Sequence, residues 1–173
     1  MPNKDILKIL DIARLAPTAG NQQPWKFLVV KDKEKITQMK DECIKDMLNF
    51  FIKRKNPSKD KIEQRKQKLT ENMVKYFSAQ VYIVVLTNES AKYPEYNLQD
   101  GALAASYLCL AAHALGYGTV YITDAIPDAI TKQVLNIPEE YKRVCITPVG
   151  VPAEWPETPK KKTIDEVVTF ESV

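Results

Sequence analysis

The sequence predicts a mixed α+β or α/β fold in which helices cover a sheet. Amphipathic helical patterns alternate along the chain with short runs of β-branched and aromatic residues. One such run, at 79–87, is apolar nearly throughout, as in a strand that is covered on both faces. The chain has 173 residues and shows no repeat, low-complexity stretch or linker. We therefore expect a single domain, 1–173, with a real core.

The first predicted helix spans 5–15 and is followed by a strand. Its apolar side chains recur at helical spacing and form one stripe: Ile6, Ile9, Leu10 and Ala13. Asn3 can cap this helix, and Pro17 ends it because a proline ring clashes with the preceding turn. Residues 25–30 are rich in β-branched and aromatic side chains and predict the first strand.

The middle of the chain predicts three helices. Residues 33–53 and 60–77 are amphipathic and are separated by the Asn-Pro-Ser turn at 56–58. Residues 97–115 form a long helix of mostly small residues, which another helix or a ligand can approach closely. Gly116 is the expected terminator of that helix.

The last third predicts two strands around a short helix. Residues 117–123 form the third strand, 126–137 the helix with Pro127 near its first turn, and 141–152 the fourth strand. A final β-like run lies at 167–170.

The composition is that of a soluble globular protein, with 45% hydrophobic and 27% charged residues. No run is long enough to span a bilayer, and the N-terminus lacks signal-peptide features, so a cytoplasmic location without a membrane partner is the default expectation. The net charge of +3 combines +6 over 31–75 with −3 elsewhere. Nucleic-acid binding by the basic segment is one alternative, and it would weaken steeply with salt. Its lysines alternate with acids at helical spacing, which favours a solvated helix face and no nucleic-acid partner.

Cysteine and histidine usage gives no indication of a metal site. Cys43, Cys109 and Cys145 are far apart and predict reduced, buried thiols. The one histidine, His113, lies within the small-residue helix without an acidic neighbour in sequence. The sequence also lacks the GxSxG, HExxH and GxxxxGK[ST] motifs, so the hydrolase, metalloenzyme and P-loop classes lose support.

Two polar stretches are candidates for a cofactor site. "ARLAPTAGNQQPW" places a threonine and three amides, Thr18, Asn21, Gln22 and Gln23, in one turn, and "TPKKK" places three cations together, Lys160–Lys162. Amides suit the edge of a flat heterocycle, and lysines suit a phosphate. A helix C-cap with a loop, and a solvated tail, explain the same residues without a ligand. The residue patterns alone leave both explanations open.

"ARLAPTAGNQQPWKFLVV" resembles the signature of the nitroreductase family, whose members are FMN-dependent oxidoreductases, in the pattern A-P-[ST]-x-x-N-x-Q-P-W. Three further stretches are similar to family features in the same order: "NLQDGALAASYLCLAAHALGYGTVYIT", "VCITPVGVPAEWP" and "PKKKTIDEVV". Together they cover most of 6–168. The resemblance implies an α/β/α sandwich with a mostly antiparallel mixed sheet of four or five strands, and a homodimer with the long helix in its interface.

The resemblance also implies the residues of a flavin site shared between two subunits. No side chain is expected to act as a catalytic group, because FMN carries the chemistry. The positions that match the family motifs are Pro17, Thr18 and Asn21 at the flavin, Gln23 nearby, the backbone of Asp124 and Ala125 on the N5 side, and Lys161 at the phosphate with Lys160 and Lys162 as neighbours. NAD(P)H is the implied hydride donor, and a nitroaromatic, quinone or similar small molecule is the implied acceptor.

One family feature, an R-R-S-x-R segment whose arginines hold the phosphate, does not occur in this sequence. Either Arg14 and the tail lysines replace it or FMN binds weakly, since a lost arginine–phosphate contact costs about 1.5–3 kcal/mol. The missing segment supports an alternative: a flavin-binding dimer without catalysis that acts as a carrier or sensor.

Overall fold

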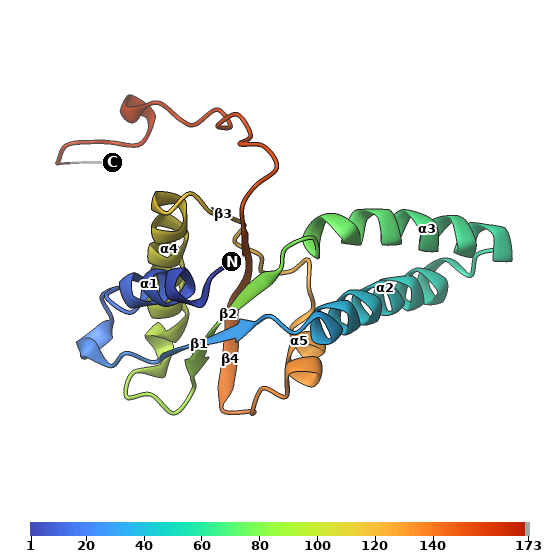
Figure 1. Cartoon of the computed structure of the whole chain (residues 1–173), viewed down its shortest axis with the longest axis horizontal. Coiled ribbons are helices and arrows are strands. Elements are labelled where there is room, and N and C mark those ends of the chain that lie inside the picture. Colours follow the sequence, from blue (N-terminus) through green and yellow to red (C-terminus); the bar gives the residue numbers. More distant parts are fainter. Residues whose placement is uncertain (172–173) are drawn as a thin grey trace.

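The computed structural model describes residues 1–171 and contains a four-stranded antiparallel sheet with helices on both faces (Figure 1). The strands are β1 (Trp25–Val30), β2 (Val81–Asn88), β3 (Gly118–Thr119) and β4 (Tyr141–Gly150), in the order β1-β2-β4-β3. Helices on both faces of an antiparallel sheet confirm the predicted α+β class and the three-layer sandwich.

The central strand β2 separates two hydrophobic cores because successive side chains of a strand point to opposite faces. Val81, Ile83 and Val85 belong to one core, and Tyr82, Val84 and Leu86 belong to the other. All six side chains are buried, which confirms the prediction that this strand is covered on both faces. The Tyr82 hydroxyl donates to the Tyr76 carbonyl at 2.8 Å, so its polar end is satisfied inside the core.

Helices α1 (Asn3–Ala13) and α4 (Asn97–Ala114) cover the first face. The prediction that Asn3 caps α1 is wrong, because Asn3 is already the first helical residue and its Oδ1 accepts from Lys31 Nζ at 2.8 Å. The helix instead begins after Pro2, which has extended backbone angles and makes no side-chain cap.

The small residues of α4 pack against the chain's own sheet and α1. Ala105 and Ala112 are fully buried in that core, and Ala104 is fully buried as well. The opposite face of α4 carries Leu103, Tyr107 and Leu110 at i, i+4 and i+7, all exposed to solvent. The helix ends as predicted at Gly116, whose φ of +81° allows the Tyr117 N–H to donate back to the Ala112 carbonyl at 2.9 Å. The apolar outer face, and not the alanine face, is thus available to a partner.

Helices α2 (Lys33–Lys55), α3 (Lys59–Tyr76) and α5 (Asp128–Leu135) cover the second face. Asp32 caps α2 with its side chain, and Asn56 ends α2 in the left-handed conformation, as the predicted turn at 56–58 requires. The buried residues of α2 and α3 lie only in the halves near the sheet. The far halves extend past the sheet as a helical hairpin (Figure 1).

Two predicted strands differ from the structure. The third is reduced to Gly118–Thr119 and a single bridge between Ile122 and Ile146; beyond that bridge, the Thr123 carbonyl accepts from the side chain of Arg143. The β-like run at 167–170 forms no strand; it follows a short 3-10 turn at Ile164–Glu166, closed by hydrogen bonds between Thr163 and Glu166. Within residues 1–171, no helix is both long and apolar enough to cross a membrane.

Candidate functional site

The turn between α1 and β1 carries the first group of predicted site residues. Gly20, Asn21 and Gln23 all have positive φ, at +53°, +54° and +50°. These left-handed conformations are rare for side chains with a Cβ, so the turn has a defined and unusual shape. The Gln23 N–H donates to Thr18 Oγ1 at 3.1 Å, and Gln23 Nε2 donates to Asn21 Oδ1 at 3.0 Å. Thr18, Asn21 and Gln23 are therefore brought together in one polar cluster, with Pro17 exposed beside them.

A buried carboxylate in α4 holds this turn in place. Asp100 is only 4% exposed, and its two oxygens accept from the Ala19 N–H at 3.0 Å and from Gln22 Nε2 at 2.8 Å. Gln22 also exchanges two hydrogen bonds with the backbone of Tyr93. Because Gln22 turns inward, the neighbouring amides of Asn21 and Gln23 are left on the outside.

The sequence reasoning did not identify Asp100, and it noted Gln22 among the amides of the turn without giving it a role. The available signal was an acid in the first turn of an otherwise apolar helix, "NLQDGALAA". Such a position ordinarily indicates a favourable charge at a helix N-terminus. Only the fold shows that Asp100 instead contacts a loop about 80 residues earlier in the chain.

The segment before α5 carries the second group, Asp124 and Ala125. One arginine of β4 fixes its backbone: Arg143 Nη2 donates to the Thr123 carbonyl and Nη1 to the Ile126 carbonyl, each at 2.7 Å. Arg143 Nη1 also donates to Thr131 Oγ1 at 3.1 Å. The side chain of Arg143 is only 6% exposed.

The charge of Arg143 is partly compensated by Asp128. Arg143 Nε lies 3.4 Å from Asp128 Oδ1, in an ion pair. Burial lowers the pKa of the Arg143 guanidinium below its ordinary value, and Asp128 acts in the opposite direction. Arg143 was not predicted from the sequence, since an arginine in a strand usually lies on a solvated face.

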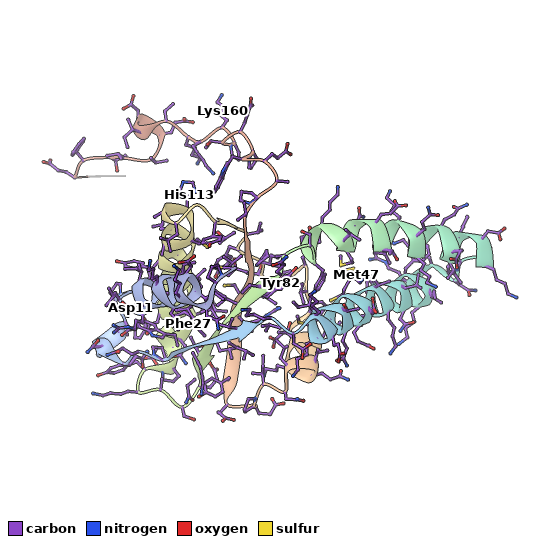
Figure 2. All side chains as sticks on the ribbon, in the orientation of Figure 1. Asp11, Phe27, Met47, Tyr82, His113 and Lys160 are labelled. Carbon is purple, nitrogen blue, oxygen red and sulfur yellow. The ribbon has the colours of Figure 1, made fainter. Side chains whose placement is uncertain are left out.

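The lysines Lys160–Lys162 form the third group and lie on a tail that is exposed almost throughout 151–171. Figure 2 shows Lys160 on this tail, away from the sheet and its helices. The tail makes one aromatic contact with the body, where the rings of Trp155 and His113 meet edge to face at 5.0 Å between centroids. Arg14, the other candidate cation, pairs with Asp11 at 2.6 Å.

A single chain does not bring the three groups together. The turn at 17–23, the segment at 123–126 and the tail lie at separate places around the sheet (Figure 1). Their chemistry still fits the parts of a flavin nucleotide. The half-buried hydroxyl of Thr18 and the exposed amides of Asn21 and Gln23 suit the polar edge of the ring, and the tail lysines suit a phosphate. Within residues 1–171, no group of three His, Cys, Asp or Glu is placed to hold a metal ion.

Comparison with known proteins assigns the fold to a family. Residues 1–151 match the model of the nitroreductase family. The iodotyrosine deiodinase of Thermotoga neapolitana is 29% identical over 98% of this chain and 88% of its own length.

Solved structures agree with this assignment. A crystal structure of oxidised iodotyrosine deiodinase bound to FMN and 3-iodo-L-tyrosine has a TM-score of 0.75 and 27% identity, and the match covers 98% of this chain and 90% of that one. An FMN-dependent nitroreductase of Clostridium difficile has a TM-score of 0.71 and 25% identity, over 100% and 90% of the two chains. The chain belongs to the nitroreductase family.

Proposed function

We propose that this chain is an FMN-dependent oxidoreductase that passes hydride from NAD(P)H to an electron-poor acceptor such as a nitroaromatic or a quinone. The observation that carries this proposal is the turn at 17–23, whose exposed polar groups are fixed by Asp100 and Gln22 in a chain of the nitroreductase family. When bound, FMN supplies reversible two-electron chemistry at N5. With a nitro group as acceptor, one NAD(P)H and one proton are consumed, and one nitroso group, one NAD(P)+ and one water are formed.

The proposal gives each group of residues one task. Pro17, Thr18, Asn21 and Gln23 hold the edge of the ring, and the backbone at Asp124 and Ala125 faces the N5 side. The lysines at 160–162 neutralise the phosphate. The support is that Asp100 and Arg143 hold the first two segments rigidly, which orients a ligand without further ordering.

We further propose a homodimer in which two chains complete each site. The separation of the three groups within one chain supports this arrangement. The exposed apolar face of α4 supports it as well, since exposed apolar patches commonly mark interfaces. The tail at 151–171 has few contacts with its own subunit and would reach across the partner. The chain would act as one FMN-binding domain, 1–173, and the cytoplasmic location stays a prediction.

The direct test is reconstitution of the purified protein with excess FMN, followed by gel filtration and a visible spectrum. We expect one flavin per subunit, and anaerobic bleaching on addition of NADH or NADPH. No bound flavin would refute the proposal. Bound flavin that neither nucleotide bleaches would favour the carrier or sensor alternative.

Reductive deiodination is a second candidate function, favoured by the 29% identity to the Thermotoga deiodinase over nearly the whole chain. In that reaction two electrons and a proton replace iodine on the aromatic ring by hydrogen and release iodide. The assay is iodide release from 3-iodo-L-tyrosine by the reduced, FMN-loaded protein. Nitroaromatic reduction without iodide release would exclude this candidate.

A further inference from the structure

The hairpin of α2 and α3 leaves a cleft above the segment 120–127. One hollow of about 680 Å³ is lined by Phe50, Phe51, Arg54 and Pro127 among others, and a second of about 670 Å³ by Tyr76 and Val120 among others. Met47 and Arg65 line both hollows, so the two are neighbours along one cleft. Figure 2 shows Met47 between the two helices on this side of the sheet.

The cleft has an excess of unpaired positive charge. The first hollow is lined by four cations, Lys53, Arg54, Lys55 and Arg65, and by one acid, Asp46. Within residues 1–171, none of the four cations forms an ion pair, whereas Lys45 on the same helix pairs with Glu42 at 3.2 Å. Arg65 Nε is buried and has no hydrogen-bond acceptor in the described chain. A buried donor without an acceptor is unfavourable, and a bound anion would supply the missing acceptor.

Aromatic rings accompany these charges. The Arg54 guanidinium carbon lies 6.0 Å from the centre of the Phe50 ring, and that of Arg65 lies 5.8 Å from the centre of Phe51. Phe50 is 63% exposed although it lines the hollow. A guanidinium that contacts a ring with its face keeps N–H groups at its edge for a carboxylate. The exposed Phe50 ring and the half-buried Phe51 ring, each beside a guanidinium group, suit a ligand that is both aromatic and anionic.

We propose that this cleft binds the electron acceptor and selects aromatic carboxylates, with Arg65 as the main anion-binding side chain. The proposal rests on the proposed function, because Val120, Ile122 and Pro127, which line the cleft, lie on either side of Asp124 and Ala125 in the chain. An acceptor in the cleft would lie beside the backbone assigned to the N5 side. The aromatic part would contact Phe50 and Phe51, and the carboxylate would take the N–H groups of Arg65.

The test is calorimetric binding to the FMN-reconstituted protein, with two ligands of nearly equal shape. 4-Nitrobenzoate carries the carboxylate, and 4-nitrobenzamide is its neutral counterpart. We expect Arg65→Gln to weaken 4-nitrobenzoate binding about tenfold or more and to leave 4-nitrobenzamide within twofold. The matched control is Lys66→Gln, which removes the same charge from the next, exposed position of α3 and should change neither. If Arg65→Gln folds poorly, Arg65→Lys and Arg54→Gln can replace it. Each should weaken the binding of 4-nitrobenzoate by a smaller factor.

Three outcomes would overturn the proposal: equal affinity of the wild type for both ligands, equal losses in Arg65→Gln and Lys66→Gln, or a loss of FMN affinity in Arg65→Gln with riboflavin unaffected. The last outcome would assign Arg65 to the flavin phosphate. Because calorimetry needs no turnover, it can also be run on protein that binds no flavin. Tighter binding of 4-nitrobenzoate than of 4-nitrobenzamide by the flavin-free protein would support the anion-binding role of the cleft even if the proposed function fails.

Discussion

Replacing Arg143 by Met should destabilise the protein by about 3 kcal/mol. Met retains much of the aliphatic volume but removes the guanidinium from a site that is 6% exposed. The Ile126 carbonyl and the fully buried Thr131 hydroxyl would then lose their donor. Asp128 is 44% exposed and Thr123 is an exposed residue, so the carboxylate and that carbonyl can both bind water instead. The loss therefore lies at the lower end of the about 3–5 kcal/mol typical of breaking a buried ion pair.

The assay is urea unfolding followed by circular dichroism. With a slope of about 2 kcal/mol per molar urea, the midpoint should fall by about 1.5 M. Lys142→Met is the matched control. Lys142 is the neighbour of Arg143 in the sequence, but its side chain is 68% exposed and its ion pair with Glu89 lies at the surface. A midpoint change below about 0.5 M for Arg143→Met, or equal changes in both variants, would refute the assigned role of Arg143.

Three other predictions concern the turn, the tail and the buried thiols. Asp100→Asn places an amide N–H donor against the donors of Ala19 and Gln22. The affinity for FMN, measured by flavin fluorescence, should therefore fall about tenfold. An unchanged affinity would contradict the role of Asp100 in anchoring the turn. Changing Lys160–Lys162 together to Gln should weaken FMN about 10- to 100-fold and leave riboflavin unchanged; equal effects on both flavins would exclude a phosphate contact. Burial raises the pKa of Cys43 to about 11 and of Cys145 to about 12, so each native thiol stays protonated where the unfolded one ionises. Each buried thiol therefore makes its full contribution to the free energy of unfolding below pH 9. That contribution declines by roughly 1 kcal/mol per pH unit for each thiol as the pH rises toward those values. Urea midpoints that stay flat from pH 9 to 10.5 would contradict this prediction.

The sequence predicted the fold well wherever a periodic apolar pattern coincided with a clear terminator. β2 is an example, since its residues are apolar on both faces and only a covered strand accommodates them. The end of α4 at Gly116 was predictable for a local reason, because a positive φ favours glycine. The strand at 117–123 was overestimated because its β-branched residues suit a strand, but β4 pairs with only part of it.

The candidate site was predictable only in part. The turn at 17–23 could be identified because its motif is contiguous in sequence. Asp100 and Arg143 could not, since each acts on a loop distant in the chain through hydrogen bonds that exist only after folding. The cations of the α2–α3 hairpin were recognised in sequence as a solvated helix face. The structure places four of them beside a cleft, and within residues 1–171 these four form no ion pair.

The sequence by itself determined the order of the helices and strands, the apolar faces that form the two cores, and a motif typical of the nitroreductase family. These properties depend on local spacing and on side-chain chemistry, which are read directly from neighbouring residues. Only the tertiary structure decided which buried polar groups fix the two site segments, how far the third strand extends, and that the three candidate groups lie apart in one chain. Those properties depend on contacts between distant residues, and a pairing of this kind leaves no periodic trace in the sequence.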